Sequence, residues 1–343
     1  MLPQKAYMNI SNIRLLNQQL VNPQMSDIHE LVAWMGMLQA QEYTMMRWAV
    51  GIRLKRSSMS SFRKAFDSGQ VVRTHLFRCT WQLVAAEDLR WMLKLCADKN
   101  KKAIRYYGQG ISEKDFEHAC DLICQALAGQ QSMTKEAIIA SLRELGLSGD
   151  AYTMSKYIQM AEAEGLICSG HLDDNQNTYA LIDGRIPSAN EPSHEESVIL
   201  LARKYFRSHS PATLKDFVWW TNLSAGECKN AIDSIAGELT AERHNDDMYY
   251  IHQDCRTKGC RKKLLLLPSY DEYLIGYKSR HHAIAEQFCR QAYNKNGIFY
   301  PVIVQNGEVI GIWHPGKKAT FFEDGNKVDI SRLLSDFHQF MDC

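Results

Sequence analysis

The sequence lacks the features that mark membrane and exported proteins. No apolar run approaches the roughly 18 residues that a membrane-spanning helix needs. The longest run, Leu264–Leu267, is typical of a buried strand. Residues 1–9 do not combine a basic segment with an apolar one, so we expect no signal peptide. These absences predict a cytoplasmic protein with no membrane partner.

Metal-binding patterns are also missing. The ten cysteines are scattered, and the closest pairs have no second pair of Cys or His at the spacing of a structural zinc site. These pairs are Cys120/Cys124 and Cys255/Cys260. The adjacent His281 and His282 have no carboxylate at a ligand spacing. We therefore expect no metal, no cofactor and reduced cysteines, half of which fill the core.

A strong net charge is missing too, since the formal charge is only +1. The charges are nevertheless distributed unevenly. Between Arg47 and Arg105 there are fourteen Lys or Arg residues and four Asp or Glu residues, so this segment is basic and the rest of the chain is acidic. Such asymmetry indicates a polyanionic partner for the N-terminal part. The alternative is a set of solvated helix faces, with acidic residues from elsewhere in the sequence lying nearby in space.

The chain does have length and a recurring order of elements. Its 343 residues are too many for one small core and predict two to four modules. In three successive segments, helices are followed by two short strands, which is the order of a winged helix. The segments are about 80 residues apart and share no side-chain motif, so we interpret them as a repeat of architecture only.

The first winged helix is expected over residues 1–110. Helices are predicted at 11–20, 26–38, 43–54, 58–67 and 86–96, and strands at 71–73 and 82–84. Ser11 and Ser26 are expected to cap the first two helices. The Gln39-Ala40-Gln41 segment falls between two of these helices.

The second winged helix is expected over residues 111–186 and the third over 193–254, joined by a linker at 187–192. The second module has predicted helices at 112–128, 135–145 and 154–164, with Thr134 and Thr153 as caps, and strands at 166–168 and 178–181 around a polar loop at 173–177. The third has predicted helices at 195–208, 214–220 and 225–235, with Thr213 and Ser224 as caps, and an outgoing strand at 249–251.

The pattern changes after Cys255. Strands are predicted at 263–267, 299–305, 309–314 and 320–323, and helices at 280–293 and 330–341. Asn306-Gly307 is a strong hairpin turn between two of the strands. The fold class is therefore predicted to be α+β, with three tandem winged-helix (helix-turn-helix) modules and a small C-terminal β-rich domain over 255–343.

Winged helices bind DNA or other proteins, and the charge asymmetry favours DNA. The second and third candidate recognition helices are not very basic. One carries Lys156 beside Glu162 and Glu164, and the other carries Lys229 beside Glu227 and Asp233. Sequence-specific readers usually present Arg, Lys, Asn and Gln there. We expect a protein that binds by backbone charge and shape and then acts on one nucleotide.

Four blocks, in order along nearly the whole chain, resemble a known family. They are Leu38–Gln41, Val72–Val84, Asp216–Thr221 and Leu267–Tyr277. The chain is similar to the winged-helix alkylpurine and crosslink-repair DNA glycosylases, the AlkZ/YcaQ-like family. That family uses Gln–apolar–Gln or Gln–apolar–Asp as its catalytic element, and Gln39, Ala40 and Gln41 match the first form. The resemblance implies that Gln39 and Gln41 hold the attacking water or stabilise the oxocarbenium ion.

The Gln-Gln form implies the branch that acts on alkylated purines. A purine alkylated at N7 or N3 carries a positive charge, so its glycosidic bond is weak and modest help is enough. A neutral amide can position water without a charged general base. We expect a monofunctional DNA N-glycosylase, a hydrolase of base excision repair, that works on double-stranded DNA with alkylated bases. It is expected to be nucleoid-associated and monomeric, and to need no cofactor.

Several residues have two interpretations. Residues i and i+2 of a regular helix do not face the same way, so Gln39 and Gln41 converge only if the chain is irregular there; otherwise they are solvent-facing residues of a helix end. Expected DNA contacts come from the basic segment and the first wing: Arg47, Arg53, Lys55, Arg73, His75, Arg78 and Trp81. The alternatives are a polar outer face of the hairpin for Arg73, His75 and Arg78, and a core position for Trp81.

Two further positions affect the expected activity. Gln82 stands where many relatives of the family have His, which places activity in question if that position acts in catalysis. Asp271-Glu272 is a carboxylate pair with no identifiable partner carboxylate, so we interpret it as structural, with a place in the DNA channel as the alternative. Two rival functions stay open, a non-catalytic DNA-binding or regulatory protein and a protein-interaction scaffold.

Overall fold

The computed structural model describes residues 9–173, 176–188, 191–323 and 327–342. Residues 1–8, positions 174 and 175 of the expected polar loop, and positions 189 and 190 of the expected linker lie outside the described residues. Within that part of the chain, no helix is long and apolar enough to cross a membrane.

Three segments repeat one topology. In each, a helix, a short first strand, two helices and a hairpin follow in order, and the first strand pairs with the last. This gives the strand orders β1-β3-β2 and β4-β6-β5. In the third segment, a single bridge from Ala212 to Tyr250 of β8 takes the place of the first strand. Pairing of the first and last strands in all three supports the winged-helix interpretation.

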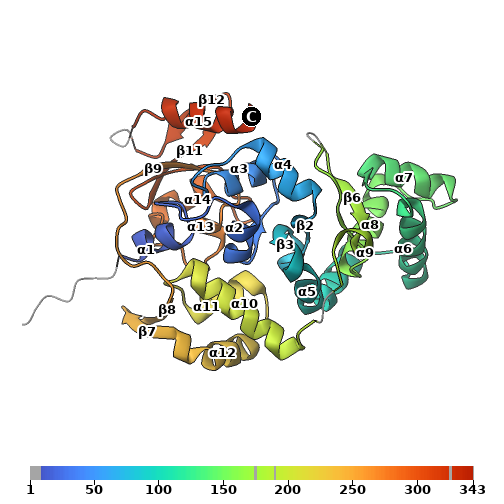
Figure 1. Ribbon diagram of the computed structural model, residues 1–343, viewed down its shortest axis with the longest axis horizontal. Helices are drawn as coiled ribbons and strands as arrows, with labels where there is room; N and C mark the ends of the chain where they lie inside the picture. The colour runs from blue at the N-terminus through green and yellow to red at the C-terminus, as the bar shows by residue number, and fades with distance from the viewer. Residues whose placement is uncertain (1–8, 174–175, 189–190, 324–326, 343) are drawn as a thin grey trace, which may run out of the picture.

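The first of these segments lies at the centre of the molecule (Figure 1). It contains α2 (Ile28–Met35), β1 (Leu38–Gln39), α3 (Met45–Gly51), α4 (Met59–Asp67), β2 (Val71–His75), the short 3-10 helix η1 (Phe77–Cys79) and β3 (Trp81–Ala85). It is preceded by α1 (Ile10–Asn17) and followed by α5 (Ala86–Tyr107). The capping residues of the first two helices are Asn9 and Asp27, not Ser11 and Ser26, because each accepts a hydrogen bond from the backbone N–H three residues on.

The second segment forms one end of the molecule (Figure 1). It contains α6 (Glu113–Leu127), β4 (Met133–Thr134), α7 (Lys135–Glu144), α8 (Ala151–Ala163), β5 (Ile167–Ser169), β6 (Thr178–Leu181) and α9 (Ile182–Arg185). Thr134 caps α7 as predicted, and its side chain accepts from Ala137 N at 3.1 Å. Asp150 rather than Thr153 caps α8, since the Asp150 carboxylate accepts from the backbone N–H of Thr153.

The third segment contains α10 (His194–His209), α11 (Leu214–Thr221), α12 (Ala225–Ser234), the 3-10 helix η2 (Ala236–Glu238), β7 (Leu239–His244) and β8 (Asp247–His252). The predicted caps Thr213 and Ser224 are both confirmed, each within a reciprocal capping box.

The C-terminal part builds a four-stranded antiparallel sheet in the order β12-β11-β10-β9. Its elements are β9 (Leu264–Leu267), α13 (Glu272–Ile275), the 3-10 helix η3 (Glu286–Phe288), α14 (Cys289–Ala292), β10 (Val302–Gln305), β11 (Glu308–His314), β12 (Lys317–Phe321) and α15 (Ser331–Asp342). Asn306 and Gly307 have φ of 54° and 95°, as the predicted hairpin turn requires. The helix predicted at 280–293 is wrong. Only the short η3 and α14 form there, and Ala283 O accepts from Val309 N at 2.8 Å, which ties the start of the segment to β11.

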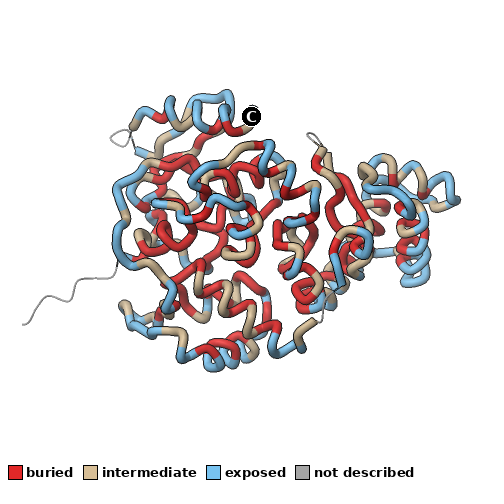
Figure 2. Tube along the Cα trace, viewed as in Figure 1, coloured by how far each residue is buried: buried red, intermediate tan, exposed pale blue. Residues whose placement is uncertain are grey.

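The apolar clusters cross the expected module boundaries. One joins α2, α3 and α4 to β9, β11 and α15, and another joins α5 to α10, α11 and α12. A third is drawn mainly from α6, α7 and α8. Figure 2 shows continuous burial through the centre and more exposed helices at the α6–α7 end. The boundaries at 110, 186 and 254 stay a prediction, and the shared cores bring residues distant in sequence onto β1.

Candidate active site at the Gln-Ala-Gln segment

The Gln-Ala-Gln segment is not the solvent-facing helix end of the alternative interpretation. Leu38 and Gln39 form β1, which pairs antiparallel with β3 so that Gln39 lies opposite Gln82. The pairing continues one residue further, since Ala40 N donates to Trp81 O at 2.9 Å. The segment is therefore extended, which is the irregularity that convergence of the two glutamines requires.

The two amide side chains reach consecutive residues at the start of β3. Gln39 Nε2 donates to Thr80 Oγ1 at 3.3 Å, and Gln41 Oε1 accepts from Trp81 N at 3.0 Å. Gln41 is exposed, whereas Gln39 is only 5% exposed. The amide oxygen Gln39 Oε1 is buried and has no hydrogen-bond partner among the described residues. An unpaired buried oxygen is costly, so it marks this atom as available to a ligand.

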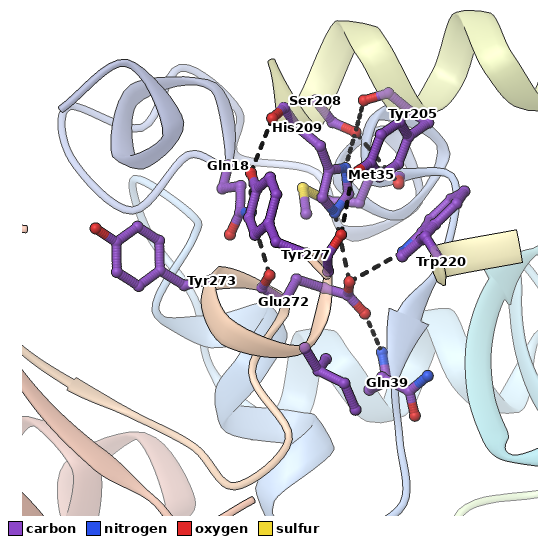
Figure 3. Close-up of polar contacts among 12 residues, drawn as sticks. Gln18, Met35, Gln39, Tyr205, Ser208, His209, Trp220, Glu272, Tyr273 and Tyr277 are labelled. Atoms are coloured by element: carbon purple, nitrogen blue, oxygen red, sulfur yellow. Dashed lines mark hydrogen bonds and ion pairs between the residues drawn. The ribbon is translucent and has the colours of Figure 1, made fainter. Parts of the chain in front are cut away.

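A buried carboxylate lies behind the Gln39 backbone (Figure 3). Glu272 Oε1 accepts from Gln39 N at 2.9 Å. Glu272 Oε2 accepts from Trp220 Nε1 at 3.1 Å and is 3.4 Å from His209 Nε2. The Glu272 side chain is 1% exposed, so it acts on the site through Gln39 and not by direct contact with solvent. From the sequence alone, Glu272 had only a structural interpretation, with a place in the DNA channel as the alternative.

Hydrogen bonding keeps this carboxylate charged. Burial acts to raise the pKa of Glu272, but the hydrogen bond from His209, the nearby charges and the Gln39 N–H outweigh it, so the pKa lies below its ordinary value. Burial lowers the pKa of His209, against the effect of its contact with Glu272. Glu272 is therefore ionised at neutral pH and places a fixed negative charge beneath the Gln-Ala-Gln backbone.

The turn between β2 and β3 is held in an uncommon conformation. Arg78 and Cys79 have φ of 63° and 52°, values that L side chains rarely adopt. The buried Asn100 side chain of α5 fixes the turn by accepting from Cys79 N at 3.1 Å and donating to Leu76 O at 2.7 Å. Gln82 also stabilises this turn, because its Nε2 donates to Phe77 O at 3.2 Å. Gln82 is 0% exposed, so this position supports the turn.

The predicted contacts on the first hairpin form one packed group. Arg73 donates from Nε to Ala40 O at 2.9 Å and from Nη1 to Asn177 Oδ1 at 2.6 Å, and its guanidinium lies 3.8 Å from the Trp81 ring. His75 Nδ1 is 2.7 Å from Glu162 Oε2, and the His75 ring lies 3.9 Å from that of Trp81. Burial lowers the pKa of Arg73 to about 10, so it stays protonated at neutral pH. Arg73 and His75 are 3% and 4% exposed, which contradicts the alternative of a polar outer face and leaves their predicted contact with DNA a prediction.

The other predicted contacts are divided between the surface and the interior. Lys55 is exposed and Trp81 is half-buried, so both can reach a ligand. Arg47 is buried and donates to Asp173 O at 3.2 Å. Arg53 is 0% exposed and forms a double ion pair with Asp271, at 2.8 and 2.9 Å. This placement corrects the prediction for Arg53, because a fully buried guanidinium with a carboxylate partner does not meet a DNA phosphate.

Part of the basic segment is neutralised by the second winged helix and the linker. Arg90, Lys94, Lys101 and Arg105 of α5 each pair with an acidic residue, namely Asp183, Glu191, Glu164 and Glu113. The alternative interpretation of the charge asymmetry therefore holds for this helix. The described residues contain no group of three or more His, Cys, Asp or Glu that could hold a metal ion.

The sequence matches a known protein family. A family model described as DNA glycosylase AlkZ-like matches residues 32–322, which is most of the chain. The chain belongs to the AlkZ-like DNA glycosylase family. The match includes the Gln-Ala-Gln segment and Glu272, and it confirms the family resemblance and the prediction of a DNA glycosylase, which hydrolyses N-glycosidic bonds.

A curated relative and a solved structure support the AlkZ-like assignment. The interstrand DNA cross-link repair glycosylase of Streptomyces sahachiroi is 21% identical over 298 residues, covering 80% of this chain and 79% of the relative. The solved structure of Streptomyces sahachiroi DNA glycosylase AlkZ aligns with a TM-score of 0.76 and 17% identity, covering 96% of this chain and 94% of that one. The structural match confirms the predicted α+β fold class.

Proposed function

We propose that this protein hydrolyses the N-glycosidic bond of N7- or N3-alkylated purines in duplex DNA, with Gln39 and Gln41 as the catalytic pair. The observation that carries the proposal is the convergence of the two amides on Thr80 and Trp81, with Gln39 Oε1 buried and unpaired among the described residues. Membership of a DNA glycosylase family supports the reaction class.

The proposed reaction needs little from the protein. As the bond between C1′ and the base nitrogen breaks, its electron pair neutralises the cationic base, and positive charge develops on the sugar. Gln39 Oε1 and the free groups of the Gln41 amide orient a water molecule, whose oxygen bonds to C1′ and whose proton passes to solvent. The Glu272 carboxylate holds the Gln39 backbone, and its charge favours the sugar cation through a low-dielectric interior.

The proposed DNA surface contains Lys55, Trp81 and Arg78, which are exposed or half-buried. Trp81 can stack on a base or fill the space beside the lesion. Arg47, Arg73 and His75 are assigned a supporting role, because they are buried and hold the hairpin and the Ala40 carbonyl in place. We expect the enzyme to act as a monofunctional glycosylase, since no lysine adjoins the glutamine pair.

The test is base release from a duplex oligonucleotide that carries one N7-alkylguanine, with abasic sites read by alkaline cleavage. We expect Gln39→Ala and Gln41→Ala to lower the single-turnover rate by roughly 100-fold, a typical effect of losing a positioned catalytic group, with DNA affinity unchanged. Gln24→Ala, at an exposed position before α2, is the matched control and should keep full activity.

Substrate range is part of the same proposal. An interstrand crosslink made through two N7-alkylpurines presents the same cationic bond at each end, and the curated Streptomyces relative is named for crosslink repair. We therefore expect unhooking of such a crosslink as well as release of simple adducts. Absence of release from methyl, bulky and crosslinked substrates, together with salt-sensitive DNA binding, would favour the non-catalytic DNA-binding alternative.

A further inference from the structure

Three cationic side chains surround the ring of Trp219, on the side of α11 next to the buried carboxylate. The guanidinium carbons of Arg78 and Arg280 lie 5.5 and 5.3 Å from the ring centre, and Lys278 Nζ lies 4.7 Å from it. Trp219 is anchored, since its Nε1 donates to Ile275 O at 3.0 Å. Arg78 comes from the β2–β3 turn and the two other cations follow α13, so the fold brings them together.

These cations have no carboxylate in an ion pair with them among the described residues. Arg78 Nε and Nη2 are buried without a hydrogen-bond partner in the same part of the chain. Arg280 donates from Nε to Leu274 O at 2.8 Å, and its Nη2 is likewise buried without a partner there. The two nearby carboxylates are already occupied. Glu272 accepts from Gln39 and Trp220, and Asp216 accepts from the backbone N–H groups of Thr213 and Lys278. Unsatisfied guanidinium donors beside further positive charge point to an anionic ligand.

The conformation of the turn is the second observation. Arg78 lies in the left-handed region, at φ 63°, followed by Cys79 at φ 52°. Asn100 holds both residues there through its contacts with Cys79 N and Leu76 O. Strained backbone that is fixed by a buried side chain is a common property of ligand-binding residues. In this conformation the half-buried Arg78 side chain lies beside the Trp219 ring.

We infer that Arg78, Lys278 and Arg280 form a binding site for a phosphodiester group of the DNA strand, and that the Trp219 ring packs against these three cations. Guanidinium groups bind phosphate oxygens with two parallel N–H donors, and Lys278 adds an exposed charge at the rim. Neither Lys278 nor Arg280 belongs to the basic segment at 47–105, so the sequence did not indicate them.

The site lies beside the Gln-Ala-Gln segment. Arg78 and Thr80 share one turn, and Thr80 Oγ1 accepts from Gln39 Nε2. Trp219 adjoins Trp220, which is bonded to the carboxylate that holds Gln39 N. A phosphate bound there therefore belongs to a nucleotide close to the one attacked. The inference rests on the proposed DNA substrate, but it does not require that Gln39 and Gln41 are catalytic.

The test is the salt dependence of binding to an undamaged duplex oligonucleotide, with base release measured in parallel. Arg78→Gln and Arg280→Gln should each lower the DNA affinity about tenfold. Lys278→Gln should lower it less. Losing one phosphate contact should reduce the slope of log affinity against log salt by about 0.9. Arg78→Lys should recover part of the affinity. Lys318→Gln, at an exposed position on β12 far from α11, is the control.

A methylphosphonate scan along the oligonucleotide identifies the phosphate. At one backbone position, the losses of affinity caused by the neutral linkage and by Arg280→Gln should not add, because both changes remove the same contact. Unchanged slopes in all three variants, with normal thermal unfolding, would overturn the phosphate site. Wild-type binding with the expected slopes but no base release would instead contradict the proposed glycosylase reaction and leave the phosphate site supported.

Discussion

Glu272 Oε1 and the backbone N–H of Gln39 form a 2.9 Å hydrogen bond across 233 residues of sequence. Because the carboxylate also accepts from Trp220 and contacts His209, it fixes β1 against α10 and α11. The Glu272 side chain therefore connects three parts of the chain at the proposed catalytic residue.

Glu272→Gln should lower the rate of base release by roughly 10- to 100-fold, since the variant keeps the shape and loses the negative charge near the developing sugar cation. Its DNA affinity and salt slope should match the wild type. Glu238→Gln is the control, because Glu238 also contacts a histidine, His252, but lies next to β7 in the third module. An equal loss of activity in both variants would argue against a specific role for Glu272.

Thr80→Val should lower base release about tenfold. The change keeps the side-chain volume and removes the Oγ1 acceptor used by Gln39 Nε2 at 3.3 Å and Gln82 Nε2 at 3.4 Å. A free Gln39 amide spends less time in the reactive orientation. Thr80→Ser, which keeps the hydroxyl group, should retain most of the activity. Full activity of Thr80→Val in single-turnover kinetics would count against positioning by Thr80.

Arg73→Lys should reduce the catalytic rate more than DNA affinity. A lysine keeps the charge but cannot donate to both Ala40 O and Asn177 Oδ1 while lying flat on Trp81. The Ala40 carbonyl between the two glutamines then loses its support. Binding and single-turnover rates measured side by side separate the two effects. A fall in the salt slope would show instead that Arg73 contacts phosphate.

Arg53→Gln should destabilise the protein by about 3–5 kcal/mol, because it leaves the Asp271 carboxylate buried without its cation. Lys229→Gln breaks the exposed pair with Asp233 and should cost less than about 1 kcal/mol. Urea unfolding monitored by tryptophan fluorescence measures both. A marginal effect of Arg53→Gln, together with a reduced salt slope for DNA binding, would return Arg53 to the DNA surface.

Stability should fall as the pH is lowered from about 6.5. Burial, with Arg14 and two neighbouring histidines, lowers the pKa of His282 to about 3, and burial also lowers the pKa of His209. Below the ordinary histidine pKa, the unfolded chain binds protons that the folded chain does not, which favours unfolding. Between pH 6.5 and 4, His282→Asn should lower the number of protons taken up on unfolding by about one. The slope of the unfolding free energy against pH becomes correspondingly smaller. An unchanged slope of unfolding free energy against pH would contradict the assignment.

Local signals in the sequence located most elements of the winged helices. Caps such as Thr134, Thr213 and Ser224 and the Asn306-Gly307 turn act over a few residues, so their outcome does not depend on distant packing. The short strand β1 escaped prediction because two residues carry no periodicity. It exists only because Leu38 and Gln39 pair with Leu83 and Gln82.

The candidate site likewise combines features that are visible in the local sequence with features that depend on the fold. The Gln-Ala-Gln motif, the family resemblance and the basic first segment follow from residue types in order, so they are visible in the sequence alone. Which of those residues are exposed depends on the folded chain. The fold buried Arg53 against Asp271, paired α5 with acidic residues of the second module, and placed Glu272, Lys278 and Arg280 beside Gln39 and Arg78. Burial and pairing depend on contacts between distant segments, because a charge in the interior needs a partner that only the completed fold supplies.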